Sequence, residues 1–150
     1  MNLLLDANVY IDYIGRKAPY FSDAQKIIMA CFFGDVRLWL PSQSATDAFY
    51  VLSKYIDGVK LQKAMSKSFE LIHMVSLTGE DVRGALQLGW DDLEDCLIAI
   101  SAQKANADFI VTRNAGDFVR SSIPAIAPAD WVKMMKDERG LAYGEESLKP

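Results

Sequence analysis

The sequence predicts an α/β protein with a short parallel sheet that helices cover on both faces. Short apolar runs such as Leu3–Leu5 and Val36–Leu40 alternate with longer segments that begin and end at helix-capping residues. Strands buried on both faces have continuous apolar runs, and parallel strands are joined by helical crossovers. The length of 150 residues suits one domain of this class.

Each element is predicted from an apolar run or from residues that start or stop a helix. Gly15 and Gly34 follow periodic apolar segments, where glycine commonly ends a helix. Thr78 precedes another such segment and is a favoured helix N-cap. The expected strands are residues 3–5, 36–40, 74–77, 108–111 and 125–126. The expected helices are residues 7–15, 22–33, 42–56, 61–72, 78–88, 92–106 and 128–137.

We expect residues 1–138 to form one domain and residues 139–150 to form a flexible C-terminal tail. The segment from Gly140 onward is mostly polar and follows the last expected helix. Such chain ends are often poorly ordered. The tail is therefore not expected to contribute to the core.

The charge balance excludes binding of nucleic acid by a broad basic surface. The chain has 20 acidic and 16 basic residues, a net charge of -4 and an isoelectric point of about 4.9. Nucleic-acid-binding domains usually have the opposite balance. Any contact with phosphates must therefore use a local patch or bound cations.

Cysteine content and the N-terminus favour a cytoplasmic protein. Cys31 and Cys96 both lie beside apolar residues and are too few for a disulfide scaffold, so we expect reduced thiols in the core. Asp6 interrupts the first apolar run too early for a signal peptide. No apolar stretch approaches the length of a membrane span, so we expect no membrane partner.

Carboxylates lie close to several expected strands, and this placement is the most informative feature of the sequence. Asp6 directly follows the first strand, and Asp117 lies shortly after the strand at residues 108–111. Asp92 and Asp95 begin the helix before that strand, and Asp47 lies near the start of another helix. Ligands of open α/β sheets bind at the carboxyl ends of the strands. We therefore expect these acids to share one edge of the sheet.

Helix periodicity suggests where two of these acids point. Ile98 and Ala102 share the helix face of Asp95, so this carboxylate is expected to project toward the interior. Apolar and aromatic neighbours likewise argue against a plainly solvated face for Asp47. A buried carboxylate is costly without a partner, and a metal ion or a hydrogen-bond donor would serve.

Each acid also has a purely structural interpretation. Asp6 and Asp92 are suited to cap the helices that follow them, and Asp117 is suited to a turn. Caps are satisfied separately, however, and need not converge. The expected placement of all these acids near one edge of the sheet therefore favours a shared site.

A converging set of carboxylates would require a cation. Two carboxylates about 5 Å apart repel by roughly 3 kcal/mol at an effective dielectric constant near 20. Sites made only of oxygen ligands suit Mg²⁺ or Mn²⁺ rather than zinc. Such ions activate water and stabilise the leaving oxygen of a phosphodiester, which would let an acidic protein act on a polyanion.

Four sequence segments together resemble the PIN-domain family, and within it the VapC-like ribonuclease branch. These are LLLDANV at residues 3–9, TDAFYVL at 46–52, DLEDCLIA at 92–99, and IVTRN at 110–114 followed by Asp117-Phe118. The resemblance covers residues 1–135 and implies a Rossmann-like α/β/α sandwich with strand order 3-2-1-4-5. It implies an endoribonuclease that depends on Mg²⁺ or Mn²⁺. Such proteins are often dimeric and often the toxin of a type II toxin–antitoxin pair, so the implied partners are RNA, an antitoxin and a second copy.

The resemblance also assigns roles to residues of this chain. Asp6, Asp95 and Asp117 would be metal ligands, and Asp47 would complete the catalytic set where many relatives carry glutamate. The residues with supporting roles would be Asp92, Thr112 and Asn114. Apart from the resemblance, Arg113 lies beside the expected site and suits either contact with an RNA phosphate or a surface salt bridge.

Two alternatives remain open from the residues alone. A phosphatase of the haloacid-dehalogenase type also places an aspartate after the first strand, but it needs a second acid where this chain has Asn8. A non-catalytic relative that only binds RNA or protein would keep the same fold. A hydrolase that uses histidine would need His73, the single histidine, which is better explained by packing.

Overall fold

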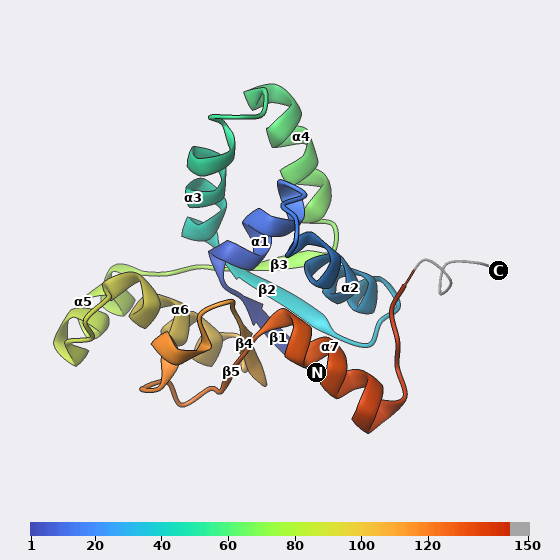
Figure 1. Cartoon of the computed structure of the whole chain (residues 1–150). Helices are drawn as coiled ribbons and strands as arrows, with labels where there is room; N and C mark the ends of the chain where they lie inside the picture. The colour runs from blue at the N-terminus through green and yellow to red at the C-terminus, as the bar shows by residue number, and fades with distance from the viewer. Residues whose placement is uncertain (145–150) are drawn as a thin grey trace.

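The computed structural model describes residues 1–144 and confirms the predicted parallel sheet. Within these residues the sheet has five strands in the order β3-β2-β1-β4-β5, and every pairing is parallel. This is the order that the family resemblance implied, and Figure 1 shows the central strands with helices around them. The strands are β1 (Asn2–Leu5), β2 (Arg37–Pro41), β3 (Ile72–Val75), β4 (Phe109–Val111) and β5 (Ala125–Ile126).

Successive side chains of the central strand β1 point to opposite faces of the sheet, so the core is divided into two layers. Leu3 and Leu5 pack into one cluster of buried side chains, whereas Leu4 packs into the other. Helices α1 (Ala7–Ile14), α2 (Phe21–Phe32), α3 (Ser42–Leu52), α4 (Gly58–Ser68) and α7 (Pro128–Arg139) contribute to the first cluster. Helix α6 (Leu93–Lys104) and the short 3-10 helix η1 (Ala115–Phe118) contribute to the second. The result is the expected α/β/α sandwich.

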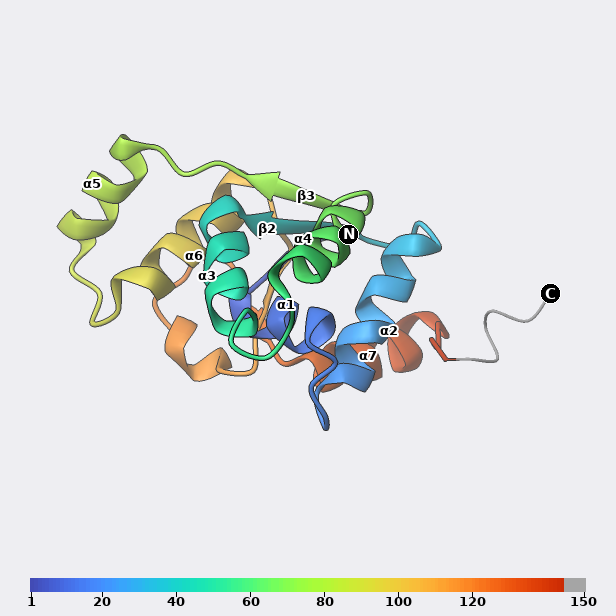
Figure 2. The same ribbon diagram turned by 90° about the horizontal axis from the view of Figure 1, so that it is seen from above.

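Helix α5 (Gly79–Leu88) lies outside these layers. Its buried residue Ala85 packs with Cys96 and Leu97 of α6, and the helix projects away from the sheet (Figures 1 and 2). Both cysteines are free thiols, as expected. Within the described residues, no helix combines the length and apolar character needed to cross a bilayer.

Several predicted boundaries were wrong. The helix expected at residues 61–72 is α4, which begins at Gly58 because the Asp57 side chain accepts a hydrogen bond from the Lys60 amide. The strand expected at residues 74–77 runs from Ile72 to Val75, since these two residues are the buried ones. Helix α3 ends at residue 52 rather than 56, and α2 begins at residue 21 without a side-chain cap.

The expected flexible tail is packed over its first residues. Gly140 ends α7 with a φ of +65°, and the chain then turns back toward α2 (Figure 1). Tyr143 is buried, stacks on Trp131 and donates a 2.8 Å hydrogen bond to Asp35. The packed structure therefore extends beyond residue 138, and the rest of the expected tail, residues 145–150, lies outside the described residues.

Candidate active site

Asp6 lies at the carboxyl end of the central strand β1. Its amide donates to the Val111 carbonyl of the neighbouring strand β4, so both strand ends are held at one edge. Its Oδ1 accepts a 2.7 Å hydrogen bond from the Ala7 amide, which makes Asp6 the N-cap of α1. The side chain is nevertheless only 7% exposed. The structural and the functional interpretation of Asp6 are therefore both compatible with its position.

Two polar residues bind the second oxygen of Asp6, and a third binds one of these two. The buried hydroxyl of Thr112 donates to Asp6 Oδ2 at 2.8 Å, and Asn8 Nδ2 donates to the same oxygen at 3.2 Å. The amide of Asn114 donates in turn to Thr112 Oγ1 at 3.1 Å. Thr112 therefore contacts Asp6 directly, and Asn114 contacts Thr112. Together these contacts hold the Asp6 carboxylate in one orientation.

Asp92 and Asp95 occupy the N-terminal turn of α6. Asp92 Oδ1 accepts a 3.0 Å hydrogen bond from the Asp95 amide, so Asp92 is the N-cap. Asp95 is only partly buried, and the prediction that it points into the interior was too strong. Partial burial, followed by repulsion from Asp92, Asp6 and Asp117, raises the pKa of Asp95 to about 6.

Electrostatic coupling shows which acids the fold brings together. Burial raises the pKa of Asp6, and Asp117 adds to this by repulsion, while hydrogen bonds from Thr112 and Ala7 oppose it. Asp6 and Asp117 both contribute to the raised pKa of Asp95. Segments more than a hundred residues apart in the sequence therefore meet in one negatively charged site at the carboxyl edge of the sheet.

Asp47 is coupled electrostatically to Glu94 rather than directly to Asp6 or Asp95 among the described residues. Its side chain is exposed, in contrast to the prediction from its apolar neighbours. Asp47 contributes to the raised pKa of Glu94 but, within the described residues, not to those of Asp6 or Asp95. Its electrostatic coupling to these acids is thus through Glu94.

Glu94 is the acid that the sequence analysis missed. Burial and repulsion from Asp6, Asp47, Asp92 and Asp95 raise its pKa. The sequence feature that could have predicted its place in the site is its position beside Asp95 in the first turn of α6. Glu94 links the exposed Asp47 to the other acids.

The donor set fits a cation that keeps part of its water shell. Within residues 1–144, no three acidic, histidine or cysteine side chains are arranged to hold one metal ion directly. Mg²⁺ usually binds to proteins through one or two carboxylates and retains several waters. Asp6 and Asp95 have the oxygen chemistry that such binding requires, and both have raised pKa values that a nearby positive charge would lower.

Arg113 is held by residues that the sequence analysis did not single out. Its Nε lies 2.8 Å from Asp12 Oδ2, and the Asp12 side chain is only 2% exposed. Its guanidinium carbon lies 4.2 Å from the centre of the Tyr20 ring. Its amide donates to Asn8 Oδ1 at 3.4 Å. The sequence feature that could have predicted this ion pair is Asp12, the acidic residue within the mostly apolar helix α1.

The raised pKa values lead to a prediction about stability without metal. The folded Asp95 keeps its proton up to a pKa of about 6, whereas the ordinary value is 3.8. The folded state therefore binds more protons than the unfolded chain between these values, and the free energy of unfolding falls as pH rises through this window. The loss should be on the order of 2 kcal/mol, after allowance for solvent screening.

Denaturant unfolding in EDTA at pH 4 to 7.5 would test this for the wild type and for Asp95→Asn. As pH rises through this window, the free energy of unfolding should fall less for the variant than for the wild type. At pH 7 the variant should be the more stable protein. Addition of Mg²⁺ at pH 7 should stabilise the wild type more than the variant. Parallel pH profiles for the two proteins would contradict the coupling.

Comparisons with known proteins agree with this architecture. Residues 2–116 match the model of a family described as PIN domain. A search of curated proteins found no match.

Similar solved structures include three from bacteria. VapBC2 from Rickettsia felis, bound to a fragment of promoter DNA, is 18% identical with a TM-score of 0.61, covering 85% of this chain and 98% of that one. A toxin–antitoxin complex from Klebsiella pneumoniae is 20% identical with a TM-score of 0.60, covering 84% and 97%. VapBC-1 from nontypeable Haemophilus influenzae is 18% identical with a TM-score of 0.61, covering 86% and 99%. At such identities the similarity establishes the fold.

Proposed function

The chain belongs to the PIN-domain family, and on that premise we propose that it is a metal-dependent endoribonuclease and the toxin of a type II toxin–antitoxin pair. The observation that carries the proposal is the electrostatic coupling of Asp6, Asp95 and Asp117 at the carboxyl edge of the sheet. Three carboxylates in this position suit phosphodiester hydrolysis by an acidic protein, because a divalent cation can offset their charge.

We assign Asp6 and Asp95 as the residues that hold Mg²⁺ or Mn²⁺, with Asp117 as a third acid that acts directly or through water. The cation would supply positive charge for the phosphate and a water of lowered pKa for in-line attack. Thr112 and Asn8 keep the Asp6 carboxylate in place. The expected products carry a 5′-phosphate and a 3′-hydroxyl.

Asp47 and Glu94 have outer roles in this proposal. Both are exposed and lie within electrostatic reach of each other. Asp47, the fourth catalytic residue implied by the family resemblance, would act on the site through water or through Glu94. Asp92 would act through α6, since its hydrogen bond to the Asp95 amide caps that helix.

An antitoxin is the protein partner we propose, and the cytoplasm is the proposed location. The similar complexes from R. felis and H. influenzae carry VapBC names, and the K. pneumoniae structure is described as a toxin–antitoxin complex. A pocket between α1, α2 and α4 suits a helical segment of such a partner. Its apolar lining residues include Tyr13, Phe21, Ile28, Phe32 and Leu71, and its charged ones are Arg16, Lys67 and Glu70. A small upstream reading frame that encodes a protein with a DNA-binding N-terminus would support the toxin–antitoxin pairing. A second copy of the chain is a further proposed partner, which a homodimer in solution would support.

Incubation of the purified protein with a pool of structured RNAs tests the function. We expect endonucleolytic cleavage with Mn²⁺ or Mg²⁺ and none with excess EDTA, because only a bound cation would offset the charge of the acids and activate the attacking water. Cleavage should return when the metal is restored.

The same assay separates the alternatives. RNA binding without cleavage would favour the non-catalytic relative. Release of phosphate from a monoester would favour the phosphatase. The structure argues against this alternative, because Asn8 stands where that chemistry needs an acid. Its side-chain amide instead donates a hydrogen bond to Asp6. Cleavage that persists in EDTA would refute the metal-dependent mechanism.

A further inference from the structure

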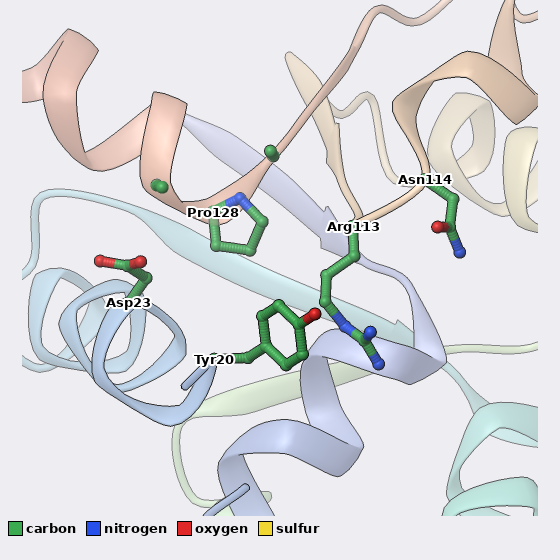
Figure 3. Close-up of a pocket in the computed structure, with 7 residues that line it drawn as sticks. Tyr20, Asp23, Arg113, Asn114 and Pro128 are labelled. Atoms are coloured by element: carbon green, nitrogen blue, oxygen red, sulfur yellow. The ribbon is translucent and has the colours of Figure 1, made fainter. Parts of the chain in front are cut away.

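A small cavity adjoins the acidic site and is not used by the proposed metal chemistry. It measures about 250 Å³ and is lined by Tyr20, Asp23, Arg113, Asn114 and the segment 127–129. Figure 3 shows the Tyr20 ring between Pro128 and the Arg113 side chain. Sites for drug-sized ligands are typically about 300–1,000 Å³, so this cavity suits a single flat ring.

The walls of the cavity favour an aromatic ring over a phosphate. Tyr20 remains 45% exposed although the Arg113 guanidinium lies over its ring. The charge of Arg113 is already compensated by the buried Asp12, and Asp23 adds a carboxylate to the wall. Exposed aromatic rings and guanidinium planes are the surfaces on which unpaired RNA bases stack.

The cavity is connected to the acidic site through consecutive residues. Asn114 lines the cavity, and its amide donates to Thr112 Oγ1, which donates to Asp6 Oδ2. The Arg113 amide donates to Asn8, which also donates to Asp6. A nucleotide bound here would therefore lie next to a phosphate that is held at Asp6.

We propose that this cavity is a base subsite, in which an unpaired RNA base beside the scissile phosphate stacks on Tyr20. The proposal rests on the proposed nuclease function and names the element that would select and orient its substrate. Asp12 is a positioning residue here, because it holds the guanidinium of Arg113 over the Tyr20 ring. Asp23 and Asn114 are placed to offer hydrogen bonds to the edge of the base.

The test measures binding of RNA that lacks one base at a time. The probe is the short single-stranded RNA that the wild type cleaves, labelled at its 5′ end, with one abasic residue moved along the strand. Anisotropy is recorded with the full chain carrying Asp6→Asn and with Mg²⁺, so that the RNA stays intact. We expect one position beside the cleavage site to weaken binding about 5- to 100-fold, the range for loss of one stacked base.

Changes at Tyr20 then identify the residue that stacks. In a Tyr20→Ala background, the intact RNA should bind about 5- to 100-fold more weakly, and the abasic residue at that position should cause no further loss. Tyr20→Phe should behave like the parent. Tyr55→Ala is the matched control, since Tyr55 is 80% exposed and does not line the cavity. Thermal unfolding of each variant verifies its fold.

The outcomes separate this proposal from the nuclease proposal. If the wild type cleaves no RNA, the nuclease function is rejected and the subsite with it. If the wild type cleaves RNA but no single abasic position matters, or the penalty persists in Tyr20→Ala, only the base subsite is overturned.

Discussion

Replacement of Asp6 or Asp95 by asparagine should abolish RNA cleavage, with a loss on the order of a thousandfold or more, while the fold survives. Asparagine is nearly isosteric with aspartate but lacks the negative charge that attracts a divalent cation. The loss should be large because the cation contributes several kcal/mol of transition-state stabilisation.

The fold should survive for reasons visible in the structure. Asparagine at position 6 can still accept the hydrogen bond from the Ala7 amide and so continue to cap α1. The raised pKa values show that both carboxylates are less favourably ionised in the folded state than in water. Removal of the Asp95 charge should therefore leave the unfolding temperature unchanged or raise it, whereas Asp6→Asn also loses the hydrogen bond from the Asn8 amide and should lower it modestly.

Single-turnover cleavage rates and thermal unfolding would be measured on the same preparations. Asp130→Asn is a matched control, because Asp130 lies in the first turn of α7 as Asp95 does in α6. The control should retain wild-type cleavage. Full activity of Asp95→Asn in the presence of Mg²⁺ would remove Asp95 from the catalytic set.

Replacement of Arg113 by alanine should destabilise the protein by about 3–5 kcal/mol at pH 7. Asp12 is 2% exposed, and the second oxygen of its carboxylate, Oδ1, has no hydrogen-bond partner among the described residues. Arg113 is the principal charge that offsets this burial. Removal of one partner of a buried ion pair leaves the other charge uncompensated, which is the costly case.

The pH dependence of this effect identifies its cause. Burial raises the pKa of Asp12, and Arg113 lowers it again. Without Arg113 the neutral carboxyl is favoured further, so the destabilisation should shrink as pH falls below the pKa of the folded variant and Asp12 takes up a proton.

Denaturant unfolding of a double-mutant cycle provides the control for Arg113. The Asp12→Asn, Arg113→Ala variant carries no buried charge at this position and should recover most of the lost stability. If Arg113→Ala alone changes the free energy of unfolding by less than about 1 kcal/mol, which is typical of an exposed ion pair, the buried pair has been misassigned.

Local patterns were sufficient for the fold class and for most elements. The run Leu3–Leu5 was recognised as a strand because its residues are apolar, and the structure divides them between two buried layers. Thr78 was recognised as a cap and forms a reciprocal capping box with Asp81. The boundary between α4 and β3 was misplaced, because Ile72 becomes buried only through its pairing with Leu38 of β2.

The sequence by itself determined the order of the strands and helices along the chain, the placement of Asp6 at the end of a strand and that of Asp95 in the first turn of a helix. These features depend on apolar runs and capping residues, which act over a few positions in the chain. Only the tertiary structure decided which groups interact: Glu94 joins the acids, Asp47 is coupled to Glu94, and Asp12 pairs with Arg113. The reason is physical, since desolvation and charge coupling depend on distances through space, and the pairing of β1 with β4 sets those distances.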